Sequence, residues 1–61
     1  MDGKKYVKIG KAAEMIGCSP QTLRNYERKG IFVPEAVLET GHRMYSVEQI
    51  EKFIQEQMGD I

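Results

Sequence analysis

The chain has 61 residues, and its nine basic and nine acidic side chains cancel to a formal net charge of zero. This length holds one small domain, and the lone Cys18 and lone His42 exclude an internal disulfide and an all-protein zinc or iron–sulfur site built from these two ligands. No apolar run exceeds three residues, which excludes a bilayer-spanning helix and a signal-peptide core, so we expect a cytoplasmic protein without metal or cofactor.

The neutral total conceals an uneven distribution of charge. Residues 1–45 contain eight basic and five acidic side chains, a net charge of +3, whereas residues 46–61 contain one basic and four acidic side chains, a net charge of −3. A neutral protein has little non-specific affinity for nucleic acid, but a basic segment can provide a local binding surface. Such a surface is therefore expected in the first 45 residues.

The N-terminal third predicts a flexible end followed by a short helix. Residues 1–5 are polar and are expected to be flexible, and residues 6–58 are expected to form the folded domain. Gly10 can cap a helix over residues 11–16, and Gly17 suits the left-handed position that ends it. The apolar stripe of this helix consists of Ala12, Ala13, Met15 and Ile16.

A second helix is predicted over residues 20–29. Ser19 is a good N-cap, and Pro20 suits the first helical position because its missing N–H would be unpaired there. Gly30 ends the helix. Two short helices joined by a three-residue turn that contains Gly17 are typical of a helix-turn-helix.

A hairpin and a third helix complete the predicted plan. Residues 36–38 and 43–45 are short strand candidates on either side of a turn at Gly41. Ser46 and Gln49 form a capping box, preceded by Tyr45 as a hydrophobic staple. The helix that follows carries an apolar stripe of Val47, Ile50, Phe53, Ile54 and Met58. The sequence thus predicts a mainly α winged helix-turn-helix with three helices and a small β-hairpin as the wing.

The second helix separates into an inward and an outward face. At about 100° per residue, Leu23 and Tyr26 point inward, and Glu27 falls beside the edge of the core. No acid is therefore expected on the opposite face. That outward face consists of Gln21, Arg24, Asn25 and Arg28.

These residue types predict contact with double-stranded DNA. Arginine can bind guanine or phosphate, and Asn and Gln can pair with adenine edges in the major groove. The hairpin tip can reach the phosphate backbone, and the Tyr26 hydroxyl can donate to a phosphate. Each feature also has an explanation without DNA: the helix face can simply be solvated, His42 can be a solvent-exposed turn residue, and Tyr26 can be a core aromatic. The predicted DNA-binding residues are Gln21, Thr22, Arg24, Asn25, Tyr26, Arg28, His42 and Arg43.

Three segments together resemble the DNA-binding domain of the MerR family of bacterial transcription regulators. They are residues 9–17, residues 19–30 with Thr-Leu-Arg-Asn-Tyr-Glu, and residues 41–46 with Gly-His-Arg-Met-Tyr-Ser. The resemblance implies a winged helix-turn-helix whose second helix enters the major groove. It also implies that Arg24 and Tyr26 contact phosphates or groove edges and that Arg43 grips the backbone from the wing.

Two departures from the family leave alternatives open. Asn25 stands where the family often has a second tyrosine, which puts the base preference at that point in doubt. The family normally continues into a dimerising coiled coil and an effector-binding domain, and we expect neither in these 61 residues. The resemblance therefore also admits an excisionase, or the DNA-binding front of a transposon serine recombinase.

A rival from another functional class is a protein-interaction module. Its docking surface would be the apolar C-terminal tail, and the same tail would serve a homodimer or an assembly on DNA; its residues are Phe53, Ile54, Met58 and Ile61. An enzyme is not expected, because the chain has no Cys/His/Asp cluster, Gly-rich phosphate loop or Ser/His/acid set to place in a cleft.

Overall fold

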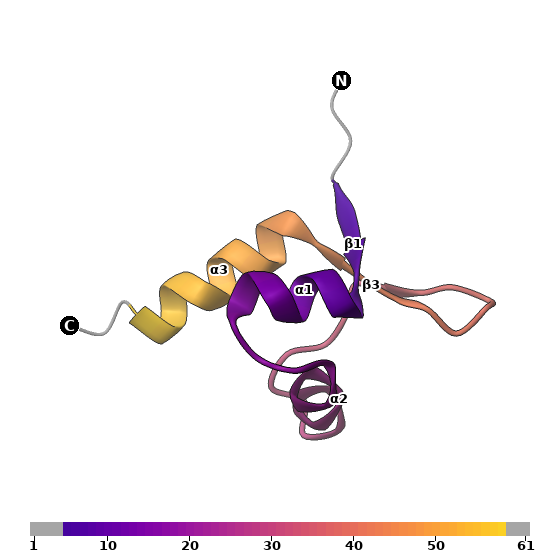
Figure 1. Cartoon of the computed structure of the whole chain (residues 1–61), viewed down its shortest axis with the longest axis horizontal. Helices are drawn as coiled ribbons and strands as arrows, with labels where there is room; N and C mark the ends of the chain where they lie inside the picture. Colours follow the sequence, from indigo (N-terminus) through magenta and orange to yellow (C-terminus); the bar gives the residue numbers. More distant parts are fainter. Residues whose placement is uncertain (1–4, 59–61) are drawn as a thin grey trace.

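The computed structural model describes residues 5–58, with the side chains of residues 5–57. Its described residues fold into three helices and a small antiparallel sheet, whose hairpin projects away from the helices (Figure 1). The winged helix-turn-helix predicted from the sequence is confirmed. In chain order the elements are β1 (Tyr6–Lys8), α1 (Ile9–Ile16), α2 (Pro20–Arg28), β2 (Ala36–Val37), β3 (Arg43–Ser46) and α3 (Val47–Met58).

The sheet contains a strand that sequence analysis missed. Its order is β1-β3-β2, both pairings are antiparallel, and β1 pairs Tyr6 with Ser46 and Lys8 with Met44. Three residues are too few to show an alternating pattern, so the strand exists only through this long-range partner. The backbone N–H of Val47 also donates to the carbonyl oxygen of Lys5, 2.9 Å away. Residues 1–4 of the predicted flexible end lie outside the described residues.

Helix α1 begins two residues before its predicted start. Lys8, in extended conformation, occupies the N-cap position and makes no side-chain cap. Because β1 runs directly into α1, strand pairing sets the start of the helix in place of the predicted cap at Gly10. At the other end Gly17 is left-handed, with φ 94°, and its N–H donates to the Ala13 carbonyl at 2.8 Å. The predicted glycine stop is confirmed.

Gly17 and Gly10 provide a matched test of this turn. A Cβ added at either position meets nothing within 4 Å, so only the backbone conformation differs between them. We expect Gly17→Ala to lower the free energy of unfolding by about 1 kcal/mol, because the left-handed region is costly for a residue with a Cβ. Gly10→Ala, inside α1, should raise it by about 0.5 kcal/mol. Urea unfolding followed by circular dichroism measures both, and equal stabilities would contradict the assignment.

Helix α2 has the predicted start and ends one residue early. The Ser19 side chain accepts from the backbone N–H of Thr22 at 3.2 Å, and Pro20 occupies the first turn. The helix ends at Arg28, with Lys29 as its C-cap and Gly30 at φ 73°. The turn between α1 and α2 is thus only three residues long, which fixes how α2 is presented.

The capping box at the start of α3 is confirmed. The backbone N–H of Ser46 donates to Gln49 Oε1, and the Gln49 N–H donates to Ser46 Oγ, both at 3.0 Å. Ser46 is fully buried and its hydroxyl also donates to Glu35 Oε2 at 2.9 Å. This junction therefore ties the sheet, the loop before β2 and α3 together.

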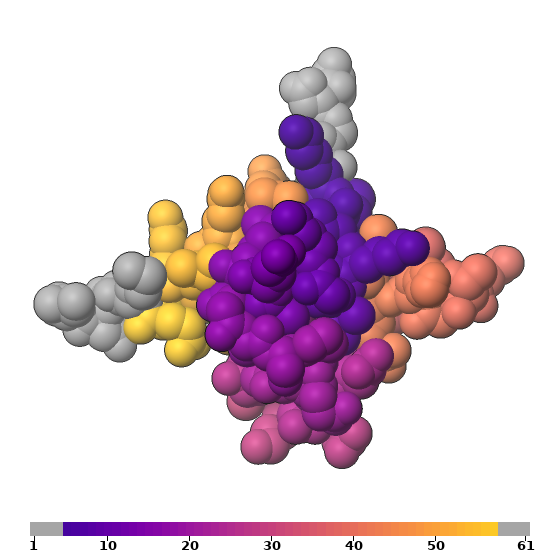
Figure 2. All heavy atoms as spheres, viewed as in Figure 1, coloured from indigo at the N-terminus to yellow at the C-terminus, as the bar shows by residue number. Residues whose placement is uncertain are grey.

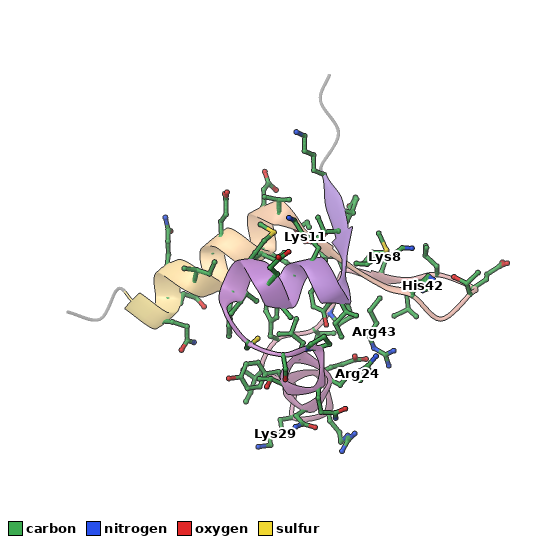
Figure 3. All side chains as sticks on the ribbon, viewed as in Figure 1. Lys8, Lys11, Arg24, Lys29, His42 and Arg43 are labelled. Atoms are coloured by element: carbon green, nitrogen blue, oxygen red, sulfur yellow. The ribbon has the colours of Figure 1, made fainter. Side chains whose placement is uncertain are left out.

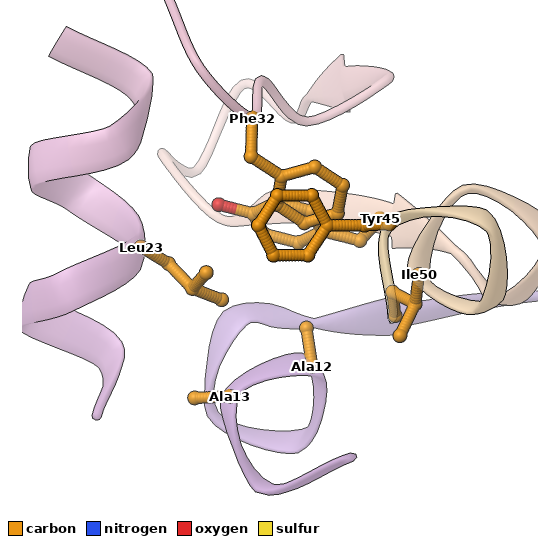
Figure 4. Close-up of a cluster of buried hydrophobic side chains, with 7 residues drawn as sticks. Ala12, Ala13, Leu23, Phe32, Tyr45 and Ile50 are labelled. Atoms are coloured by element: carbon orange, nitrogen blue, oxygen red, sulfur yellow. The ribbon is translucent and has the colours of Figure 1, made fainter. Parts of the chain in front are cut away.

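The core joins α2 to the base of the hairpin (Figure 4). Leu23, Tyr45 and Ile50 are fully buried, and the Phe32 ring stacks on Tyr45 at 5.4 Å and on Phe53 at 4.4 Å between centroids. The predicted staple residue Tyr45 is in this cluster together with Ile50, which follows the capping box. The small side chains of α1 in the core, Ala12 and Ala13, allow close approach of the other elements. The packing holds α2 and the hairpin in a fixed relation.

Candidate nucleic-acid interface

The outward face of α2 is exposed as the sequence predicts. Gln21, Arg24, Asn25 and Arg28 are all exposed, and Leu23 on the opposite side is buried. The Gln21 side-chain amide donates to Asn25 Oδ1 at 3.2 Å, so these two amides form one unit on the helix surface. Such a unit presents donors and acceptors of the kind that read base edges.

Basic residues gather where α2 faces the hairpin. Arg24 and Arg28 of α2 and Arg43 of β3 line one hollow of about 230 Å³, together with Glu27. Figure 3 shows Arg24 and Arg43 on this side, with Lys29 on a different part of α2. Three guanidinium groups and one carboxylate leave the hollow with a net positive charge. It is therefore suited to a phosphate.

Glu27 is the residue of this hollow that sequence analysis did not assign to the site. Its half-buried side chain agrees with the predicted place beside the core, off the outward face of α2, and from there it lines the hollow. Glu27 Oε1 accepts from Arg43 Nε at 2.5 Å, in a partly buried ion pair. On the helix wheel Glu27 lies only about 60° from Arg24. This closeness to a predicted DNA-binding residue is the sequence signal that could have placed Glu27 in the site.

Tyr45 lies beneath the same region. Its side chain is fully buried, and its hydroxyl, which points toward α2, makes no hydrogen bond within the described part of the chain (Figure 4). Burial raises the pKa of Tyr45, the charge of Glu27 raises this pKa further, and Arg43 and Arg24 lower it. Three of the four residues around the hollow therefore act electrostatically on one buried hydroxyl.

Two of the predicted contact residues also have structural contacts. The Tyr26 ring is half-buried and packs on Phe53, 6.0 Å between centroids at 57°. The Thr22 hydroxyl lies 3.0 Å from Ser19 Oγ at the start of α2. Packing and capping thus hold Tyr26 and Thr22 in place, whereas Arg24 and Asn25 are fully on the surface.

The hairpin forms a projection separate from α2 (Figure 2). Its predicted strands are confirmed, with Val37 opposite Arg43, and the N–H of Leu38 donates to the His42 carbonyl at 2.9 Å. Gly41, with φ 93°, makes the turn. His42 is exposed next to the hollow's Arg43. The arrangement gives two prongs, a helix and a wing, with the basic hollow between them.

The apolar stripe of α3 belongs to the core. Phe53 is buried and Ile54 packs against the core cluster, so both are already engaged within the domain. Of the other predicted docking residues, the Met58 side chain and Ile61 lie outside the described residues. The described part of this stripe therefore gives no support to the hypothesis of a protein-interaction module that docks through α3.

Residues 5–58 contain no group of three or more His, Cys, Asp or Glu placed to hold a metal ion. Burial raises the pKa of the Cys18 thiol, which disfavours the reactive thiolate. None of the described helices is both long enough and apolar enough to cross a bilayer.

Comparisons with known proteins agree with the geometry. A family model described as MerR family regulatory protein matches residues 8–45. The multidrug-efflux transporter 2 regulator of Bacillus subtilis (strain 168) is 40% identical over 52 residues, which cover 85% of this chain. The chain spans only 19% of the length of this curated relative. No solved structure matches with comparable significance.

Proposed function

The chain belongs to the MerR family of regulatory proteins, and from this premise we propose that it is a sequence-specific double-stranded DNA-binding module of a transcription regulator. The observation that carries the proposal is where the match falls. Residues 8–45 contain α1, the turn, α2, β2 and most of β3, which is the part of the fold with the basic hollow. The relative is named as a regulator, which favours regulation over recombination.

The proposed binding mode places α2 in the major groove and the wing on the backbone. An α-helix fits the major groove, where the Gln21–Asn25 unit can read base edges. The hollow then receives a phosphate between α2 and the hairpin, and His42 contacts the backbone beside it. Thr22 and Tyr26 contact phosphates or groove edges as well; Ser19 holds the first and the Phe53 ring packs against the second.

The proposal extends to domain limits and assembly. We assign residues 6–58 to the DNA-binding domain, in a protein of the cytoplasm. A single recognition helix gives weak binding, and specific sites are usually read by two helices one DNA turn apart. Two copies, as a homodimer or as an assembly on DNA, are therefore the proposed bound form.

Selection from a random pool of duplex DNA tests the function. The chain is mixed with the pool at low salt, bound duplexes are amplified over several rounds, and the enriched duplex is titrated beside a scrambled one. We expect an enriched motif, tighter binding to it than to the scrambled duplex, and weakening as salt increases. Equal affinity for the two duplexes would contradict sequence-specific recognition.

A further inference from the structure

One ion pair connects the two prongs of the proposed interface. Glu27 lies on α2 and Arg43 on β3, sixteen residues apart, and Oε1 of the first accepts from Nε of the second. Their side chains are 27% and 34% exposed, so the pair is only partly screened by water. Its position at the edge of the hollow places it next to Arg24 and Arg28.

We propose that Glu27 is a positioning residue, which holds the guanidinium of Arg43 in the orientation that grips a DNA phosphate. This inference rests on the proposed DNA-binding function and names a residue outside the predicted contact set. Glu27 itself touches no DNA in this proposal, because it is an acid; it acts through Arg43.

The chemistry of the guanidinium group indicates that Glu27 orients Arg43 and still leaves it able to bind a phosphate. Arginine has five N–H donors in a rigid fork, and the pair with Glu27 uses the one on Nε. The four donors on the terminal nitrogens remain for a second acceptor such as a phosphate. A long side chain loses rotamer freedom when it binds, and one already held in place loses less.

The position of Tyr45 strengthens the argument. Tyr45 is fully buried, and it lies close enough to the pair for the charges of Glu27, Arg43 and Arg24 to act on its hydroxyl. Ion pairs at the margin of such a low-dielectric core are stronger than those on an open surface. Glu27 thus holds the Arg43 side chain at Nε, while that side chain stays 34% exposed to solvent.

The two possible roles of Glu27 predict opposite effects of Glu27→Ala. If the acid only repels DNA, its removal adds one positive charge and should tighten binding. If it orients Arg43, its removal should weaken binding to the selected duplex about threefold to tenfold, in the range of coupling between contacting residues. The loss of one effective phosphate contact should also reduce the salt slope by up to about one unit.

The experiment compares Glu27→Ala with Glu51→Ala, an exposed acid on α3 whose removal changes the net charge equally. Nuclear magnetic resonance of the ¹⁵N-labelled chain first follows the Arg43 Nε–H signal without DNA; we expect it in the wild type and in Glu51→Ala, and its loss in Glu27→Ala. Both variants are then titrated with the selected duplex at several salt concentrations. Glu51→Ala should bind at least as tightly as the wild type.

A double-mutant cycle separates positioning from a general loss of structure. In an Arg43→Gln background, Glu27→Ala should leave affinity unchanged or improve it, whereas a folding defect would weaken both backgrounds. Binding by Glu27→Ala that equals or exceeds the wild type, or equal weakening in both backgrounds, overturns the positioning role while the DNA-binding function stands. Failure of the wild type to bind any duplex overturns both.

Discussion

Replacing Leu23 by alanine is expected to unfold a large fraction of the chain at room temperature. Leu23 is the buried residue of α2 and belongs to the hydrophobic core. Replacing a buried leucine by alanine typically lowers the free energy of unfolding by about 2–5 kcal/mol. The single core of a domain this small rarely supplies more than about 3–5 kcal/mol of stability. Circular dichroism during urea unfolding of the wild type and the variant measures the loss.

Leu38→Ala is the matched control for this prediction. The same atoms are removed, but Leu38 is 46% exposed on the hairpin, so the free energy of unfolding should change by about 0.5 kcal/mol or less. Similar losses in the two variants would mean that the core does not depend on Leu23 as the structure indicates.

Local sequence signals predicted most of the fold because their partners lie within a few residues. The capping box joins Ser46 to Gln49, three residues later, and Ser19 caps the N–H of Thr22 at the same separation. The left-handed conformation of Gly17 is a property of that single residue. Strand β1 could not be found in this way, since Tyr6 pairs with Ser46 far along the chain. The same missing strand explains why α1 was predicted to start late.

In the candidate site, too, local features could be predicted from the sequence and long-range contacts could not. Helical periodicity alone places Arg24 and Asn25 on the surface and Leu23 in the core, as the structure has them. It cannot show that Arg43 reaches back to Glu27, because that pair depends on how the hairpin packs against α2. Exposure of single residues was therefore predictable, whereas the hollow, which needs two elements together, was not.

Arg24→Ala is expected to weaken DNA binding about tenfold at physiological salt, on selected and scrambled duplexes alike. Arg24 is exposed and shares the hollow with Arg43, on the side of α2 that faces the hairpin. A position between the two prongs favours contact with a phosphate over a base edge, and phosphate contacts carry no sequence information. Titrations at several salt concentrations should show a slope smaller by about one unit.

Lys52→Ala separates this local effect from net charge. Lys52 is exposed on α3 and its removal costs the same unit of charge, so its affinity for both duplexes should change little if the interface lies on α2 and the wing. Weakening of Arg24→Ala on the selected duplex alone would assign Arg24 to a base, at about 1–3 kcal/mol. Equal binding by wild type, Arg24→Ala and Lys52→Ala at low salt would contradict the assignment of this face of α2 to the interface, because loss of a phosphate contact lowers affinity.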